Sequence, residues 1–131
     1  MLKRIATVRP EEAIDAKLVD GHPWITVRGP ITAAIGDALF ARAADFVGQQ
    51  QARRVVLDFR TAALIEDSLS LLRRVRALDA QPALRDVRTA VVCAARTNAY
   101  AFLEGIANQH GHDLRVFTDS AQAMDWLNSA P

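Results

Sequence analysis

Three short apolar runs in the second half of the chain limit the folds that it can adopt. The runs cover residues 54–59, 87–94 and 114–117, and segments with helical spacing of apolar residues separate them. Continuous apolar runs of this length are typical of strands that are covered on both faces. Strands that alternate with helices form a mostly parallel sheet with right-handed crossovers. The pattern predicts an α/β fold in which these three strands lie side by side and point the same way.

The segment that precedes these runs predicts a β-hairpin. Residues 13–19 alternate between apolar and polar side chains, and Asp20-Gly21 is a strong turn signal. Residues 24–28 then have the composition of a second strand. We expect Gly29-Pro30 to end this strand, because proline has no N–H to donate to a strand ladder.

Four segments have the spacing of amphipathic helices, and each follows residues that cap helices well. The candidate caps are Thr32, Asp67 or Ser68, Thr97 or Asn98, and Asp119 or Ser120. The first helix is expected to end near Gly48. The expected order is therefore ββαβαβαβα: a mixed, mostly parallel five-stranded sheet with an N-terminal hairpin and about four helices. We expect one domain over residues 1–131, with residues 1–10 loosely ordered.

Composition excludes several classes of function. The formal net charge is only +1, so nothing draws the chain to a nucleic-acid backbone. The single cysteine, Cys93, cannot form an intrachain disulfide and lies in an apolar run, where we expect it to be a buried core residue. No apolar stretch approaches the length that spans a membrane, so we expect a cytoplasmic protein without membrane insertion.

The residue patterns of common enzymes are missing from the sequence. His110 and His112-Asp113 have metal-ligand chemistry, but no fourth ligand has a sensible spacing, and no other metal or cofactor site is expected. The histidines have no nucleophile at a strained turn, and the six glycines are dispersed. Asp58 is expected at a strand end, where its carboxylate would accept hydrogen bonds from loop amides. We therefore predict that the chain is not an enzyme.

Three segments carry a resemblance to a known family. Gly29-Pro30-Ile31-Thr32 resembles a "G-x-I/L-T" motif, residues 55–60 (VVLDFR) resemble a "V-L-V-D-L-R" strand, and residues 115–127 resemble a tail of the form "V-x-V-F-x-D-x-x-x-A-x-x-W-L". Together with the element order, these segments resemble the STAS-domain superfamily and its SpoIIAA-like (STAS/SEC14-like) family. The resemblance implies a bacterial regulatory module that binds an as yet unidentified protein partner. A homodimer is a further option.

The resemblance also implies a candidate switch site. In anti-sigma-factor antagonists of this group, a phosphorylatable serine or threonine opens the helix after the central strand, in a pattern like "D-S-S/T-G-L". Asp67-Ser68 matches the first two letters, but Leu69 occupies the acceptor position and Ser70 replaces the glycine. The phospho-acceptor motif is thus not intact. Ser68 is the remaining candidate acceptor if the register shifts by one, and its alternative role is a helix cap.

The same helix start offers a candidate partner-binding surface. On a helical wheel, Leu69 lies outside the apolar stripe of its helix and close to Arg73 and Arg76. An exposed leucine beside arginines suits contact with a protein partner, with Asp67 at the edge of the surface. The alternative is a solitary leucine on a solvated basic face.

A second hypothesis belongs to a different functional class. The chain could bind or carry a small apolar or lipid-like molecule, with Phe40, Tyr100 and Phe102 lining the site. Such a site is expected at the carboxyl ends of the parallel strands. The alternative is that these three aromatic residues complete the core.

Overall fold

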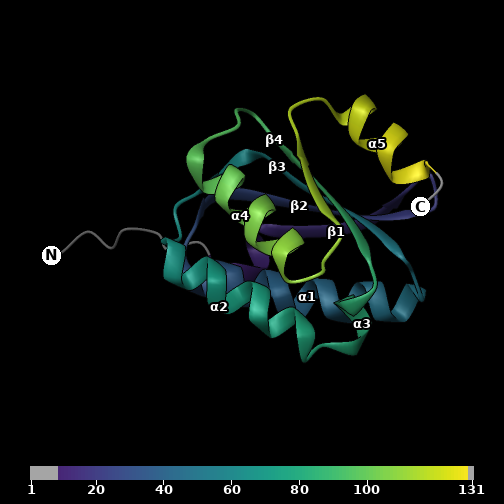
Figure 1. The fold of residues 1–131 in the computed structure, drawn as a ribbon. Helices are drawn as coiled ribbons and strands as arrows, with labels where there is room; N and C mark the ends of the chain where they lie inside the picture. Colours follow the sequence, from purple (N-terminus) through teal and green to yellow (C-terminus); the bar gives the residue numbers. More distant parts are fainter. Residues whose placement is uncertain (1–8, 130–131) are drawn as a thin grey trace, which may run out of the picture.

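The computed structural model describes residues 9–129, which contain one mixed five-stranded sheet flanked by helices (Figure 1). The strands lie in the order β1-β2-β3-β4-β5, and their bounds are Ile14–Val19, His22–Ile31, Arg54–Leu64, Arg88–Cys93 and Leu114–Phe117. Only β1 and β2 pair antiparallel, while the other neighbours pair parallel. The predicted α/β fold is confirmed, including the three parallel strands. Residues 1–8 of the segment expected to be loosely ordered lie outside the described residues.

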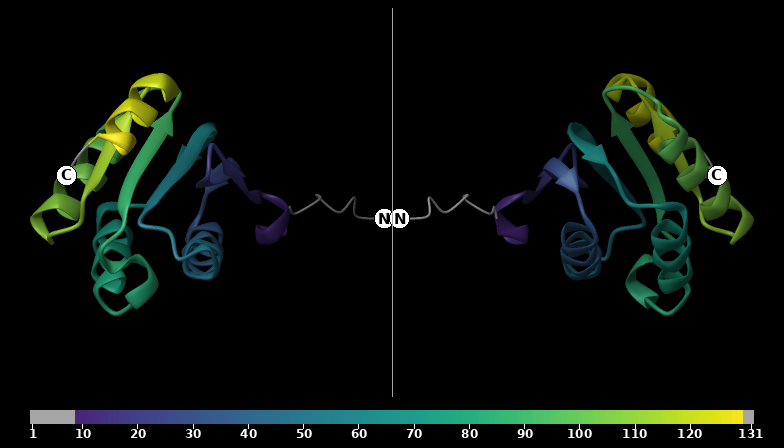
Figure 2. Two further views of the ribbon diagram at one scale, coloured as in Figure 1. Left: turned by 90° about the vertical axis from the view of Figure 1, so that its right-hand side faces the viewer. Right: turned by 90° about the vertical axis from the view of Figure 1, so that its left-hand side faces the viewer.

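Helices cover the two faces of the sheet unequally. A 3₁₀ turn, η1, and five helices have the bounds Pro10–Glu12, Ala33–Gln50 (α1), Ser68–Asp79 (α2), Pro82–Arg85 (α3), Asn98–Gln109 (α4) and Ser120–Asn128 (α5). Figure 2 shows α1 and α2 side by side beneath the sheet and α5 on its other side. None of the described helices has both the length and the apolar character needed to cross a membrane.

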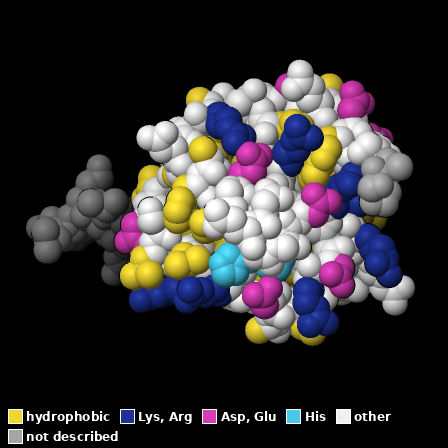
Figure 3. Space-filling view, in the orientation of Figure 1, with side chains coloured by type: hydrophobic (Ala, Val, Ile, Leu, Met, Phe, Trp, Pro, Cys, Tyr) yellow, Lys and Arg dark blue, Asp and Glu magenta, His cyan; other side chains and the backbone are white. Residues whose placement is uncertain are grey.

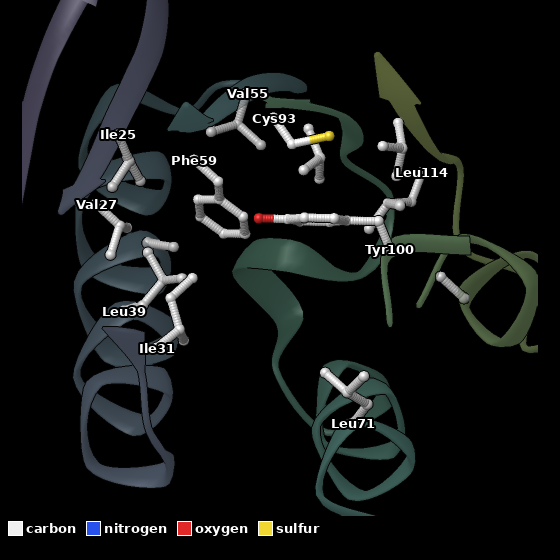
Figure 4. Packing of buried hydrophobic residues seen from close by; sticks show 14 of the residues in the cluster. Ile25, Val27, Ile31, Leu39, Val55, Phe59, Leu71, Cys93, Tyr100 and Leu114 are labelled. Atoms are coloured by element: carbon white, nitrogen blue, oxygen red, sulfur yellow. The ribbon is translucent and has the colours of Figure 1, made fainter. Parts of the chain in front are cut away.

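Each face of the sheet has its own hydrophobic core. On the face that we call the three-helix face, side chains of β1–β5 pack against α1, α2 and α4 (Figure 4). On the opposite face, which we call the α5 face, a smaller cluster is formed by residues of the sheet and of α5: Trp24, Val56, Ala90, Val92, Ala123 and Leu127. Cys93 is buried in the larger core, as expected, and burial raises the pKa of its thiol.

Two strands are longer than the sequence predicts. β2 continues through Gly29 and Pro30 to Ile31, so the expectation that Gly29-Pro30 ends the strand is wrong. Among residues 9–129, the ladder between β1 and β2 reaches Val27, and the last residues of β2 pair with β3. A proline is tolerated there because no described strand pairs with the other side of β2 at this position. β3 likewise continues beyond the apolar run to Leu64.

The helix ends agree with the predicted caps at most positions. The Thr32 side chain accepts a hydrogen bond from the N–H of Ile35 at 3.3 Å. α1 runs two residues past Gly48 to Gln50, and Gln51 then closes it with a left-handed conformation, φ 49°. The short helix α3 was not predicted. It begins with Pro82, which suits a first helical position because its missing N–H would have had no partner.

Candidate functional site

The start of α2 is the region where the family resemblance predicts a switch. Asp67 is the cap of this helix, since its side chain accepts a hydrogen bond from the N–H of Ser70 at 2.8 Å. This bond lowers the pKa of Asp67, so the carboxylate stays charged at ordinary pH. Ser68 is the first helical residue and is exposed, which leaves its hydroxyl accessible to solvent. The structure thus gives the capping role to Asp67 and not to Ser68.

Exposed apolar side chains gather around this helix start. Leu69 is 55% exposed, and Ile65, just before the cap, is exposed to a similar degree. Phe102 of the neighbouring helix α4 is also exposed, as are Arg73 and Arg76 on α2. Figure 3 shows hydrophobic side chains beside a row of basic ones over this part of the molecule. We call Ile65, Leu69, Arg73, Arg76 and Phe102 the α2 surface. Sequence reasoning missed Ile65, although an apolar residue in a connecting segment was the available signal.

A cavity lies behind α2, on the three-helix face. Its volume is about 120 Å³, and its walls come mainly from α1, α2 and the sheet. Most of the lining side chains are apolar, and they include Leu39, Phe40, Ala43, Leu71, Val75 and Leu78. Glu66 and Arg74 are the charged members of the lining. The cavity therefore combines an apolar body with one polar region.

The charged region of the cavity wall is a buried ion pair. Arg74 Nη2 donates to Glu66 Oε2 at 2.7 Å, and Arg74 Nη1 donates to Asp37 Oδ1 at 2.9 Å. The side chains of Glu66 and Arg74 are only 3% and 22% exposed. The pair presses against α1 at Gly36, where an added Cβ would lie 2.6 Å from Arg74 Nη2. Arg74 Nε is fully buried and has no hydrogen-bond partner among the described residues.

Sequence reasoning missed this pair, although the sequence contains a signal for it. Arg74 stands three residues after Leu71 and four before Leu78, so it falls within the apolar stripe of its helix. A charged residue at such a position must find a partner or reach solvent. That partner, Glu66, lies eight residues away along the chain.

The three aromatic residues predicted to line a ligand site do not converge. Phe40 lines the cavity, whereas Phe102 is exposed on α4. Tyr100 belongs to the core and is buried, with its ring centroid 6.3 Å from that of Phe59 (Figure 4). Its hydroxyl has no hydrogen-bond partner in the described part of the chain, and burial raises its pKa to about 12. The ligand site was expected at the carboxyl ends of the parallel strands, but the cavity is not confined to those ends and extends between the helices and the sheet.

Asp58 does not lie where the sequence placed it. Because β3 continues to Leu64, Asp58 lies within the strand, and its partners are not loop amides. It accepts hydrogen bonds from the N–H, Nε and Nη2 of Arg60 at 3.1, 2.9 and 2.7 Å, and from Trp24 Nε1 at 3.2 Å. Burial opposes the charge, but the bonds from Arg60 and Trp24 outweigh it and lower the pKa of Asp58. This carboxylate is fully engaged on the α5 face.

The histidine-rich loop before β5 has separate structural partners. His112 is buried, with Nε2 3.1 Å from Asp79 Oδ1, although the angles do not suit a hydrogen bond. Asp113 accepts a hydrogen bond from Arg88 Nε at 2.9 Å. Among residues 9–129, no three His, Cys, Asp or Glu side chains are grouped so that they could hold a metal ion.

Comparison with known proteins identifies the architecture. No protein-family model and no curated protein matches the sequence. Among solved structures, an anti-sigma factor antagonist from Mycobacterium paratuberculosis is 16% identical, with a TM-score of 0.61 over 88% of this chain and 93% of that one. Unphosphorylated SpoIIAA, also an anti-sigma factor antagonist, is 14% identical, with a TM-score of 0.57 over 90% and 100% of the chains.

A third structure extends the likeness beyond the antagonists. An uncharacterized protein from Shewanella loihica PV-4 with a SpoIIAA-like fold is 14% identical, with a TM-score of 0.55 over 88% of this chain and 92% of that one. In all three comparisons the similarity covers 88–90% of this chain and 92–100% of the other chain. The STAS-type fold predicted from the sequence is therefore confirmed: this chain has the SpoIIAA-like fold.

Proposed function

We propose that this chain is a non-enzymatic, cytoplasmic regulatory module that binds a protein partner through the α2 surface. Two of the similar structures are anti-sigma factor antagonists, which makes an anti-sigma factor the first partner to test. The proposal keeps the carboxylate of Asp67 at the edge of the interface, where it holds the start of α2 in place.

The observation that carries this proposal is the exposure of large apolar side chains at one helix start. Ile65 and Leu69 are each more than half exposed, and they lie within four residues of one another. Burial of such side chains in an interface is a favourable term in protein association. Arg73 and Arg76 lie beside them on α2 and favour a partner surface that carries acidic groups.

Ser68 is the proposed point of regulation. A phosphate on its exposed hydroxyl would add nearly two negative charges between Asp67 and Leu69. The added charge would oppose binding of an acidic partner surface, so phosphorylation is expected to release the partner. Mass spectrometry of protein purified from its native host tests this step. Absence of phosphate from Ser68 across growth conditions contradicts it.

The binding experiment uses two leucines as a matched pair. Leu18 of β1 is 49% exposed, close to the 55% of Leu69, but it lies near the hairpin turn, at the opposite end of the sheet from the start of α2. Affinity for anti-sigma factors encoded in the same genome is measured by calorimetry for wild type, Leu69→Asp and Leu18→Asp. We expect Leu69→Asp to weaken binding by about 30-fold, as at an interface hot spot, and Leu18→Asp to have little effect. Equal effects, or no binding by any candidate, contradict the proposal.

A second candidate function is the binding of a small apolar molecule. The cavity of about 120 Å³ behind α2 is the observation that favours it. Of the residues predicted to line such a site, Phe40 is the one in the cavity wall. Native mass spectrometry of the gently purified chain tests this function by detecting a retained molecule, and exposure of the chain to xenon tests whether the cavity admits any apolar atom.

A further inference from the structure

We infer that a pocket at the amino ends of β3 and β4 binds a small molecule that carries a phosphate monoester. The pocket has a volume of about 320 Å³, and we call it the arginine pocket. Four basic and two acidic residues contribute to its lining: Arg53, Arg54, Arg85, Arg88, Asp86 and Asp113. The inference is independent of both functions proposed above, and it is supported by the position, the charge and the size of this pocket.

The arginine pocket lies at the end of the sheet opposite the start of α2. Arg54 begins β3, Arg88 begins β4, and Asp113 directly precedes β5. The N–H of Arg88 donates to the carbonyl of Arg53 at 2.8 Å, and α3 contributes Arg85. Figure 3 shows basic and acidic side chains close together on the side of the molecule where Figure 1 places α3. The pocket is therefore separate from the α2 surface, which follows the carboxyl end of β3.

Arg88 is the most firmly held charge of the pocket. Its side chain is only 14% exposed, and Nε donates to Asp113 Oδ2 at 2.9 Å. Nη1 donates to the carbonyl of Trp126 at 2.8 Å and to Ser129 Oγ at 3.1 Å. Asp113 balances the charge of this arginine, so the remaining charged residues decide which ligand the pocket attracts.

The remaining charges of the lining are mostly positive. Within residues 9–129, Arg53, Arg54 and Arg85 form no ion pair, and three arginines against Asp86 leave a net charge of +2. Arg54 is also the partner of Arg88 in the ladder between β3 and β4, so both side chains leave the same face of the sheet. Like charges on paired strand residues repel one another. A bound anion would offset this repulsion.

This charge favours an anion with two negative charges on one group. A phosphate monoester carries nearly two negative charges at neutral pH and has three acceptor oxygens around one phosphorus. The arginines of the lining stand on three separate segments, the starts of β3 and β4 and the helix α3. A tetrahedral group accepts hydrogen bonds from several sides, whereas the two oxygens of a carboxylate lie in one plane. Guanidinium groups suit phosphate in both charge and geometry.

The size of the pocket favours a small molecule over a polymer. Pockets for small organic ligands start at about 300 Å³, and this one measures about 320 Å³. It has room for a phosphate together with a small organic group. The whole chain has a formal net charge of only +1, so the pocket is a local concentration of charge and not part of a basic surface for nucleic acid.

Two phenyl esters test the charge preference with the full chain at about pH 8. Phenyl phosphate and phenyl sulfate have nearly the same shape, but at this pH the phosphate carries two negative charges and the sulfate one. Their dissociation constants are measured from amide chemical shifts at constant ionic strength, in a buffer without phosphate. We expect phenyl phosphate to bind about 5-fold more tightly than phenyl sulfate, because its second charge meets a pocket of net positive charge. The largest shifts are expected at residues 85–88.

A pair of double variants assigns the binding to the arginine pocket. Arg53→Gln/Arg85→Gln removes two positive charges from exposed residues of the lining and should weaken binding of phenyl phosphate by about 10-fold. Lys17→Gln/Arg42→Gln removes the same charge from exposed residues outside the pocket and should have little effect. Amide spectra verify that each variant is folded.

The opposite change in charge provides a second test. Asp86→Asn removes a negative charge from the lining, so it should tighten binding of phenyl phosphate by about 3-fold. Asp45→Asn makes the same change at an exposed position of α1 outside the pocket and should not.

Four outcomes overturn the inference. Equal affinity for the two esters contradicts the preference for a doubly charged group. Tighter binding of succinate, which carries the same charge on two carboxylates, contradicts the phosphate class. Equal weakening by the two double variants would assign the binding to the net charge of the chain and not to the arginine pocket. Absence of binding by both esters contradicts the site itself.

Discussion

Each face of the sheet has a carboxylate–arginine pair with a buried carboxylate, and the two pairs differ in how many of their polar atoms are hydrogen-bonded. On the α5 face, Asp58 accepts four hydrogen bonds from Arg60 and Trp24, and the Arg60 side chain is 46% exposed. On the three-helix face, Glu66 and Arg74 form one mutual hydrogen bond beside a cavity, and Arg74 Nε has no described partner. The pair on the α5 face thus has a fully hydrogen-bonded carboxylate, whereas the pair on the three-helix face borders a cavity.

The difference suggests which face of the sheet is free to acquire a function. The cluster on the α5 face is closed by Leu127, which is inaccessible to solvent, and the guanidinium of Arg88 lies 4.7 Å from the ring centroid of Trp126. The three-helix face has the cavity, and the outer side of the same α2 helix has exposed Leu69. Both proposed binding functions therefore involve the three-helix side of the sheet, and the predictions below test how the two faces differ.

The largest expected effect comes from truncating one core leucine on each face. Leu127→Ala should lower the free energy of unfolding by about 4 kcal/mol, because it opens a cavity in a closed cluster. Leu71→Ala should cost only about 2 kcal/mol, because Leu71 borders an existing cavity and loses fewer contacts. Urea unfolding measures both. The volume-conserving Leu127→Met and Leu71→Met are the controls. A larger loss for Leu71→Ala would contradict the difference between the faces.

The next effect comes from removing the arginine of each buried pair. Arg74→Met leaves the Glu66 carboxylate buried without its cation and should lower the free energy of unfolding by about 3 kcal/mol. Arg60→Met should cost about 1 kcal/mol, since Asp58 keeps its bonds from the Trp24 side chain and from a backbone N–H. Asp37→Asn, which changes an exposed partner of Arg74, is the control and should be nearly neutral. Equal losses of free energy of unfolding for the two arginine variants would contradict the difference between the two pairs.

Tyr100 extends the comparison to alkaline pH. Burial raises its pKa to about 12, against about 10 in the unfolded chain, so the folded state favours the neutral phenol. The resulting stability is complete below pH 10 and is lost as pH rises toward 12, by about 3 kcal/mol for two pKa units. Tyr100 is the only tyrosine, so ultraviolet titration measures its pKa directly.

A single variant isolates this contribution. Tyr100→Phe removes a buried hydroxyl that has no described partner, so it should leave stability at pH 7 unchanged or slightly higher. It should also flatten the loss of stability between pH 10 and 12. Trp24, whose N–H is bonded to Asp58, gives the contrast: Trp24→Phe should be destabilising already at pH 7. A Tyr100 titration near pH 10 would mean that the hydroxyl reaches water or a partner.

The sheet could be predicted from the sequence because its signals are local. Apolar runs, one turn dipeptide and helical spacing are enough to give the element order and the parallel strands. The extension of β3 to Leu64 was missed because Ala62 and Ala63 have little strand character of their own. Their pairing with Gly29 and Pro30 of β2 is a tertiary contact, and it decides their structure.

The candidate site was less predictable, because it depends on which side of each helix faces inward. Tyr100 and Phe102 are two residues apart on α4, so they point in different directions and cannot line one site. That conclusion was available from the spacing alone. The contact of Gly36 with Arg74 was not, since it depends on how closely α1 approaches α2. Leu69 could be identified because its position on the helix wheel requires no partner element.

The smallest effects are expected at the aspartates that cap α2 and α5. Asp119 accepts hydrogen bonds from the N–H groups of Ala121 and Gln122 at 2.8 and 3.4 Å, whereas Asp67 accepts one, from Ser70. Asp119→Ala should lower the free energy of unfolding by about 1 kcal/mol, because α5 contributes Ala123 and Leu127 to the core on its face. Asp67→Ala should lower the free energy of unfolding by less than Asp119→Ala does. Asparagine caps helices about as well as aspartate, so the Asn variants are the controls.

The pH dependence of the Asp67 cap connects this small effect to the α2 surface. The bond from the Ser70 N–H lowers the pKa of Asp67, so its stabilising effect is present above the ordinary aspartate pKa of about 4 and is lost as pH falls through the lowered value. The protection factors of amides in the first turn of α2, which correct for the intrinsic pH dependence of exchange, should therefore fall at acid pH in the wild type. In Asp67→Asn they should stay constant, because the amide cap does not titrate. Partner binding that weakens together with this fraying would mean that the partner recognises the ordered helix start, whereas binding that is unaffected would limit the contact to side chains farther along α2.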